Sequence, residues 1–314
     1  MPSHVRLFFL PLLLLFALCC TPLAAQNGAG QSRTVDSLRS NRDTLEQSRD
    51  TGRTAPTQRT RRSDSLMRVQ DSLLLAANTT LARDSMSMES YQQIAAIYKE
   101  RRQYRSALTI AERMVAVNPY SALANYIYGD ILLDNELPDR AIPVLQRALM
   151  MEPRFVRART TLADAYAMRR LFDTALAHLD TAIRTNPRYA QSYLQRAELL
   201  SELGRDSAAM EDYQSAGELA PEDTTIWLQL VRLQVKTYRH AEALPVIHYL
   251  LSRDTTAEVL LLLADAAEHT GETAEAITAY ERFILLFPRH RRALEAERIL
   301  LRLRGTVYQG GRQE

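Results

Sequence analysis

The stretch that decides the fold runs from Val156 to Pro187 and reads VRARTTLADAYAMRRLFDTALAHLDTAIRTNP. It holds two segments in which apolar residues recur at helical spacing, so each segment has one apolar face. The closing proline lacks the amide that a helix needs and disfavours helical geometry in Asn186, so the second helix ends there. The apolar faces consist of Leu162, Ala163 and Tyr166 in the first segment and Ala175, Leu179 and Ala182 in the second. The stretch therefore predicts two helices joined by a turn.

The same pattern recurs along the chain with a period of 34 residues. Prolines end successive units at Pro119, Pro153, Pro187 and Pro221, and Pro288 follows one residue short of two further periods. With a slip of one residue before the last unit, an alanine keeps the same phase at Ala107, Ala141, Ala175, Ala209, Ala243 and Ala276. A fixed period of this size is typical of a solenoid, in which each unit buries its apolar face by stacking on its neighbours.

Within each unit, small and aromatic residues occupy fixed places. The fourth unit has Tyr193, Ala197, Leu200, Ala209, Tyr213, Ala216 and Pro221, and the second has Gly129, Leu132, Ala141, Leu145, Ala148 and Pro153. These residues resemble the pattern of the tetratricopeptide repeat (TPR) family, in which small residues let paired helices approach closely. The resemblance implies an all-α fold: a right-handed superhelical solenoid of about six TPR helix-turn-helix repeats with a C-terminal capping helix.

Two repeats depart from this pattern. The first has Met114 where the family has alanine. The fifth is one residue short and has Val231, Leu250 and Thr255 at the small and proline positions. Pro245, near the start of its second helix, removes a helical hydrogen bond. We therefore expect the second helix of the fifth repeat to be irregular.

The periodicity also sets the organisation of the chain. The TPR array spans residues 88–288, with repeats starting near residues 88, 122, 156, 190, 224 and 257. Residues 64–87 predict a helix that covers the first repeat, followed by a connector, because their apolar residues follow helical spacing. Residues 289–305 predict a capping helix ended by Gly305, and residues 306–314 form a tail. Gly204 and Gly271 stand at one phase in the turns, as a left-handed helix terminus requires.

Residues 1–25 have the pattern of a signal peptide. An almost purely apolar run from Leu7 to Cys20 is too short for a normal membrane span, and the small residue Ala25 precedes the expected cleavage site. The alternative is a lipid anchor at Cys19 or Cys20, although the residues before both cysteines depart from the bacterial lipobox. Both alternatives predict an exported protein that is periplasmic or associated with the outer membrane of a bacterial envelope.

Residues 26–63 are rich in polar residues and lack apolar periodicity. Such a segment cannot bury enough apolar surface to offset its ordering entropy, so we predict a disordered linker. Its second half is basic, with Arg49, Arg53, Arg59, Arg61 and Arg62. This segment is a candidate ligand, held in cis, for an acidic surface of the array.

Composition argues against several classes of function. The formal net charge is only +2, so no global field recruits nucleic acid or an anionic membrane. Both cysteines lie in the apolar run, so we expect no disulfide in the mature chain. The sequence has no phosphate-binding glycine loop and no nucleophile elbow, and its histidines do not pair at metal-ligand spacing. We therefore expect no enzyme activity, no cofactor and no metal.

The resemblance implies a concave surface, lined by the first helix of each repeat, that binds extended or helical peptides. The repeat period places acidic residues along this surface. We predict that the peptide-binding groove contains Asp130, Asp134, Asp164, Glu198, Glu202, Asp265, Tyr126 and Leu194. One interpretation is a cradle for a basic, partly apolar segment, and the other is an ordinary solvated face. An acidic groove repels phosphate, so we expect no nucleic acid partner.

The sequence thus favours a non-enzymatic scaffold of the bacterial cell envelope that holds a protein or peptide partner, basic in character, in an acidic concave groove. The alternative is an accessory subunit, a lipoprotein in one variant, of an outer-membrane assembly, secretion or pilus machine. The two hypotheses differ in the partner rather than in the mechanism. The only membrane attachment that we expect is the lipid anchor at Cys19 or Cys20.

Overall fold

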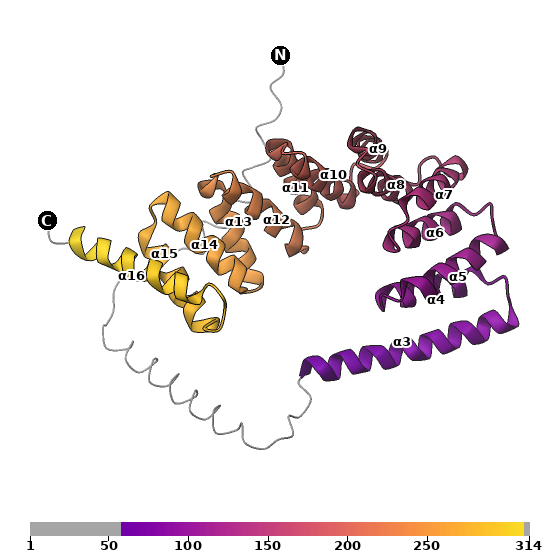
Figure 1. The fold of residues 1–314 in the computed structure, drawn as a ribbon, viewed down its shortest axis with the longest axis horizontal. Helices are drawn as coiled ribbons and strands as arrows, with labels where there is room; N and C mark the ends of the chain where they lie inside the picture. The colour runs from indigo at the N-terminus through magenta and orange to yellow at the C-terminus, as the bar shows by residue number, and fades with distance from the viewer. Residues whose placement is uncertain (1–57, 311–314) are drawn as a thin grey trace, which may run out of the picture. The chain divides into compact units, whose positions relative to one another are not determined.

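The computed structural model describes residues 58–310 (Figure 1). The signal peptide and residues 26–57 of the predicted linker lie outside the described residues. Within residues 58–310 the ordered elements are α-helices and there is no strand, which confirms the predicted all-α fold. The helices are α3 (Gln58–Arg83), α4 (Met88–Glu100), α5 (Tyr104–Val117), α6 (Ala122–Asp134), α7 (Pro138–Met151), α8 (Val156–Met168), α9 (Phe172–Thr185), α10 (Ala190–Glu202), α11 (Asp206–Leu219), α12 (Thr224–Lys236), α13 (His240–Arg253), α14 (Ala257–Thr270), α15 (Thr273–Leu286) and α16 (Ala293–Gly310).

The chain divides into two compact units, residues 1–68 and 69–314, and the repeats belong to the second. From α4 to α16, each helix packs against the next, so that α4 and α5, α6 and α7, and the following pairs form six repeats. The first helices of neighbouring repeats also pack on one another, as α6 does on α8, α8 on α10 and α12 on α14. The first helices therefore line a common surface in repeats two to four, and again in repeats five and six.

The alanine that recurs with the period lies at the crossing between helices. Ala107, Ala141, Ala175, Ala209, Ala243 and Ala276 are all fully buried. Two glycines mark still closer contacts. A Cβ atom on Gly129 would lie 2.5 Å from Leu145, and one on Gly217 would lie 2.7 Å from the Trp227 ring. These small residues set the short distance between packed helices.

The turn inside each repeat is closed by one residue in the left-handed conformation. Gly204 and Gly271 have φ values of 71° and 83°, as their phase predicts. In the other four repeats the same place is held by Arg102, Glu136, Arg170 and Tyr238, with φ between 56° and 60°. The amide of the following residue donates to a carbonyl five residues back, as Arg205 N does to Leu200 O at 2.9 Å. This is the Schellman arrangement, which satisfies the last carbonyls of the first helix.

The second helix of the fifth repeat is not irregular, so that prediction is wrong. Helix α13 runs unbroken from His240 to Arg253, with Pro245 at its sixth residue. Helix α7 carries Pro143 at the same place and is also continuous. Each proline removes a single hydrogen bond near the helix start, and both prolines are exposed, so water reaches the freed carbonyl.

The two outer helices extend further than the sequence pattern indicates. Helix α3 begins at Gln58, inside the stretch assigned to the disordered linker. Its later turns contact the first repeat, where Ala77 is buried and the Gln70 amide donates to Glu100 at 2.7 Å. Helix α16 passes through Gly305 and ends at Gly310, inside the predicted tail. A glycine in a helix costs about 1 kcal/mol, which the packing of Ala296, Leu300 and Leu303 can offset.

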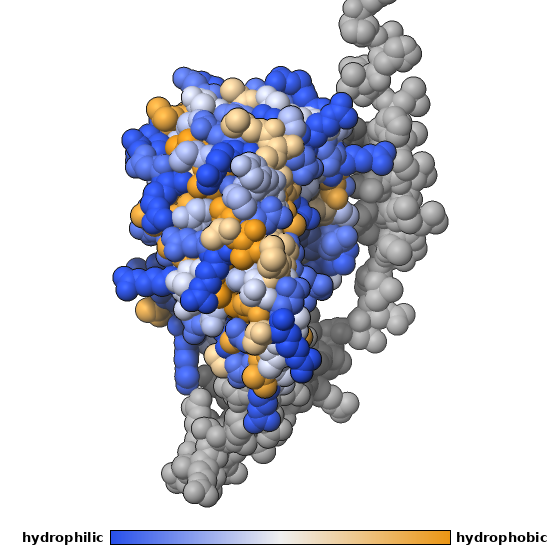
Figure 2. Space-filling view, turned by 90° about the vertical axis from the view of Figure 1, so that its right-hand side faces the viewer, coloured by the Kyte–Doolittle hydropathy of each residue, from blue (hydrophilic) through white to orange (hydrophobic). Residues whose placement is uncertain are grey.

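The surface is mixed in character. On the face that lies at the right of Figure 1, hydrophobic side chains break through a mainly hydrophilic surface (Figure 2). Within residues 58–310, every helix is too short or too polar to cross a membrane.

Candidate peptide-binding groove

Three carboxylates stand at the same phase on three consecutive first helices: Asp130 on α6, Asp164 on α8 and Glu198 on α10. We call these three residues the acidic row. Asp164, in the middle, is half-buried, and its pKa is raised to about 7, first by burial and then by the charges of Glu198 and Asp130. The Glu198 side chain is exposed, but desolvation of its carboxylate raises its pKa as well. The charges of Asp130 and Glu198 each disfavour ionisation of Asp164.

The carboxylate of Asp164 lies among polar side chains. The Gln195 amide donates to Asp164 Oδ2 at 2.5 Å. Among the described residues, no lysine or arginine forms an ion pair with this carboxylate. Beside it lies an open hollow of about 400 Å³, lined by Asp164, Ala167, Met168, Arg170 and Glu202. Met168 is 46% exposed, so the hollow has apolar surface next to the acid.

At the amino-terminal end of the row, Asp130 already has a cationic partner. Lys99 on α4 reaches across to α6, where its Nζ pairs with Asp130 and lies 2.9 Å from Asp134 Oδ2. Burial still raises the pKa of Asp130 in spite of this lysine. The sequence did not predict the contact of Lys99 with Asp130. Comparing repeats by their period identifies equivalent positions, whereas this contact joins two positions that are not equivalent.

The predicted groove residues beyond Glu198 do not continue the row. Arg232 occupies the equivalent position on α12 and pairs with Glu258 through two contacts of 2.5 and 2.7 Å. Lys236, one turn later, lies 3.3 Å from Asp206. On α14, Asp265 contacts His269 rather than another carboxylate of the groove. The acidic row is thus confined to repeats two to four.

The two apolar groove residues are half-buried. The Tyr126 ring lies 5.0 Å from the Phe155 ring, and Leu194 packs against the cluster that contains Tyr213. Burial and the nearby Asp130 carboxylate raise the pKa of Tyr126. Glu202 is exposed at the rim of the hollow. The row therefore has apolar side chains beside it.

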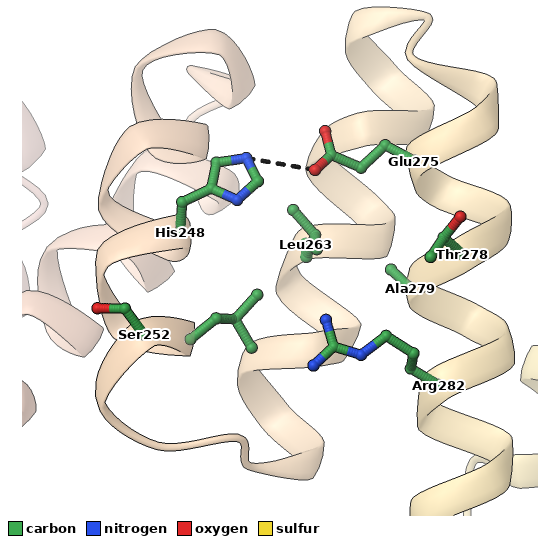
Figure 3. A pocket seen from close by; sticks show the side chains of 8 residues that line it. His248, Ser252, Leu263, Glu275, Thr278, Ala279 and Arg282 are labelled. Carbon is green, nitrogen blue, oxygen red and sulfur yellow. Dashed lines mark ion pairs between the residues drawn. The ribbon is translucent and has the colours of Figure 1, made fainter. Parts of the chain in front are cut away.

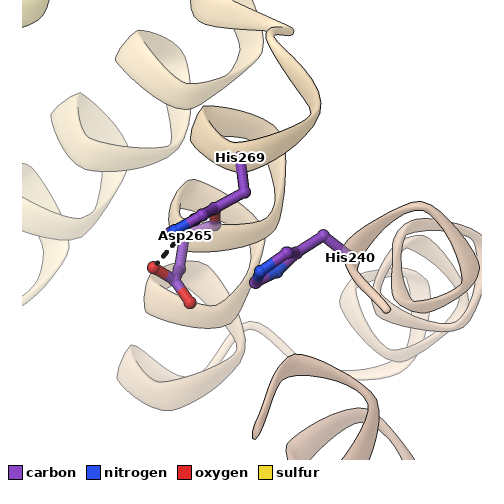
Figure 4. Close-up of side chains that lie close together, drawn as sticks. All are labelled: His240, Asp265 and His269. Carbon is purple, nitrogen blue, oxygen red and sulfur yellow. Dashed lines mark hydrogen bonds and ion pairs between the residues drawn. The ribbon is translucent and has the colours of Figure 1, made fainter. Parts of the chain in front are cut away.

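Two further groups of polar side chains lie outside the row. His248 and Glu275, 3.3 Å apart, line a pocket of about 300 Å³ between α13, α14 and α15 (Figure 3). His240 and His269 stack with their ring centroids 4.2 Å apart, beside Asp265 (Figure 4). The sequence spacing of the histidines gives no sign of this second group, because its members belong to neighbouring repeats.

Models of the tetratricopeptide repeat match residues 94–159, 132–197, 190–233 and 228–290. Together these matches cover residues 94–290 without a gap. The chain belongs to the tetratricopeptide repeat family. Both the resemblance stated from the sequence and the solenoid architecture are thereby confirmed.

Solved TPR structures share the fold. The structure of pilF from Pseudomonas aeruginosa has 17% sequence identity and a TM-score of 0.55, and the match covers 69% of this chain and 98% of that one. The C-terminal part of a TPR repeat-containing protein from Cytophaga hutchinsonii also has 17% identity, with a TM-score of 0.54 and coverage of 75% and 98%. No curated protein matches the sequence.

Proposed function

We propose that this TPR protein is a non-enzymatic scaffold that holds a basic, partly apolar segment of a protein partner in its groove. The observation that carries the proposal is the acidic row in repeats two to four. Asp164 is half-buried between two other carboxylates and has an amide as its polar partner. A cationic side chain in the hollow would stabilise the ionised form of this carboxylate, which its surroundings otherwise disfavour.

The neighbouring side chains support a ligand with apolar character as well. Tyr126 and Leu194 lie on the same first helices as the row, and Met168 lines the hollow beside Asp164. A segment that places an arginine or lysine against Asp164 would rest its aliphatic stem on this apolar surface. The proposed occupant is therefore a basic peptide rather than a free cation.

We also propose that the protein is exported to a bacterial envelope. The support is the signal pattern of residues 1–25, and the expected mature amino terminus is Gln26. A fatty acid on Cys19 or Cys20 would instead identify a lipoprotein. An accessory subunit of an envelope machine remains the alternative to a free scaffold, and affinity purification from envelope extract separates the two by their partners.

The groove is tested by titrating a labelled peptide of residues 49–62, which is arginine-rich, into residues 69–314 at low salt. We expect binding that weakens as salt is added. The double variant Asp164→Lys, Glu198→Lys should weaken it at least about tenfold, since each reversal replaces an attraction of about 1 kcal/mol by a repulsion.

The matched control is Glu211→Lys, Glu218→Lys, which makes the same change in net charge on two exposed glutamates of α11. This control should bind the peptide nearly as well as the unmodified repeats. Equal weakening by both double variants would assign the binding to overall charge rather than to the groove. Failure of the unmodified repeats to bind would identify the acidic row as an ordinary solvated face.

A further inference from the structure

A cluster of three potential metal ligands joins the fifth and sixth repeats. His240 is the first residue of α13, whereas Asp265 and His269 lie one turn apart on α14. One ligand atom from each residue lies within 4.8 Å of the others, and the three side chains point toward one another (Figure 4). None of these residues belongs to the acidic row.

His240 is the unusual member of the cluster. Its side chain is buried, with the residue only 7% exposed, and neither ring nitrogen has a hydrogen-bond partner among the described residues. A buried polar group without a partner is costly, and such groups in native proteins usually have a ligand or a structural reason. Both ring nitrogens of His240 are therefore available to a ligand.

His269 is oriented by its own helix. Its Nδ1 lies 2.8 Å from the backbone oxygen of Asp265 and 3.5 Å from the carboxylate Oδ1 of the same residue. A carbonyl oxygen can only accept, so Nδ1–H is the hydrogen-bond donor in this contact. Nε2 is then the ring nitrogen with a free lone pair. A hydrogen bond of this kind commonly fixes the tautomer of a metal-ligating histidine.

We propose that His240, Asp265 and His269 bind a divalent transition-metal ion of the zinc class. Two imidazole nitrogens and one carboxylate oxygen suit Zn²⁺, whereas Mg²⁺ and Ca²⁺ prefer oxygen ligands alone. The two rings are stacked and inclined by only 13°, so binding an ion would require one of them to turn. His240 has no ring hydrogen bond to lose, and rotation about its Cβ–Cγ bond would bring a lone pair toward Nε2 of His269. Three protein ligands leave a fourth position open.

Because of where the site lies in the fold, a bound ion would have two effects. It would link the start of α13 to α14 and so tie the fifth repeat to the sixth. Asp265 and His269 also stand at the positions on α14 that are equivalent to Asp130 and Asp134 on α6, so two of the three ligands come from a first helix. A histidine or carboxylate of a partner could complete the coordination there.

The test uses the full chain without a histidine tag. Zn²⁺ is titrated calorimetrically, and Co²⁺ serves as a spectroscopic probe of tetrahedral nitrogen and oxygen ligation. We expect one ion per chain. His269→Gln alters an exposed side chain, and His240→Phe keeps a buried ring while removing its nitrogens. Each substitution should weaken Zn²⁺ affinity at least tenfold. Loss of a residue that only hydrogen-bonds to a metal ligand already lowers metal affinity about 10–100-fold, and loss of a ligand should cost no less.

The control is His248→Gln, which changes the histidine that pairs with Glu275 in the neighbouring pocket. It should leave the affinity and the Co²⁺ spectrum unchanged. The proposal is overturned if the unmodified chain binds no stoichiometric Zn²⁺, if His269→Gln binds as tightly as the unmodified chain, or if His248→Gln removes the binding. Circular dichroism checks that each variant keeps its helical content.

Discussion

At the scale of single residues, the six turns share one backbone conformation but not one residue type. Glu136, at φ 60°, is exposed, and Gly204, at φ 71°, has open space around the place of a Cβ. A side chain in this conformation costs about 1–2 kcal/mol. Glu136→Gly should therefore raise the free energy of unfolding by up to about 1 kcal/mol, and Gly204→Ala should lower it by a similar amount.

Urea unfolding measures both effects. The matched control is Glu211→Gly, the same substitution at an exposed position inside α11, which should lower stability by about 1 kcal/mol because glycine is a poor helix former. If Glu136→Gly destabilises the protein as much as the control does, the left-handed residue carries no strain.

The glycines of the turns could be predicted from the sequence, and the other left-handed residues could not. Gly204 and Gly271 reveal their conformation because glycine is the residue that adopts it freely. Arg170 and Tyr238 adopt it because the packed helices on both sides fix the path of the turn, so tertiary structure overrides local preference. The position of a residue within the repeat therefore predicts a left-handed conformation better than its residue type does.

At the scale of helices, the recurring alanine sets the distance between α8 and α9. Ala175 is fully buried in a cluster with Ala163 and Leu179. Ala175→Leu would force the two helices apart and should cost about 1–3 kcal/mol of unfolding free energy. Ala177→Leu makes the same change on the exposed face of α9 and should leave the unfolding midpoint nearly unchanged. Equal midpoints for the two variants would show that the crossing does not depend on a small residue.

Helix existence followed from the sequence more reliably than helix ends did. The period identifies the paired helices because every repeat contributes the same signal. Pro245 and Gly305 suggested interruptions that α13 and α16 do not have. Each breaker costs one hydrogen bond or some backbone entropy, whereas each helix buries several apolar side chains, such as Ile247 and Leu250 in α13 and Leu300 and Leu303 in α16. Local breakers therefore do not end helices that tertiary packing holds.

At the scale of the whole array, the period predicted positions that are equivalent but not contacts between unlike positions. The period placed Asp164 and Glu198 on one surface, and in the structure the charge of Glu198 helps to raise the pKa of Asp164. It did not show that Lys99 neutralises Asp130, nor that His240 meets His269. Those contacts depend on how one repeat is rotated against the next, which the sequence pattern does not specify.

The acidic row should make stability depend on pH in a definite direction. The pKa of Asp164 is about 7 in the fold against an ordinary value of 3.8, so the folded state holds its proton more tightly than the unfolded chain does. The resulting stability is fully present below about pH 4 and is lost as pH rises through about 7. The loss amounts to about 4 kcal/mol at most, at about 1.4 kcal/mol per pKa unit.

Asp164→Asn removes this titration and keeps the shape of the side chain. Relative to the unmodified protein, the variant should gain unfolding free energy between about pH 4 and pH 8, measured by urea unfolding across that range. Asp173→Asn, at an exposed aspartate of the next helix, should show no such gain. Parallel pH curves for Asp164→Asn and the unmodified protein would contradict the raised pKa of Asp164. A bound basic peptide should flatten the curve of the unmodified protein, because a cation beside Asp164 lowers its pKa and so offsets the cost of ionising it.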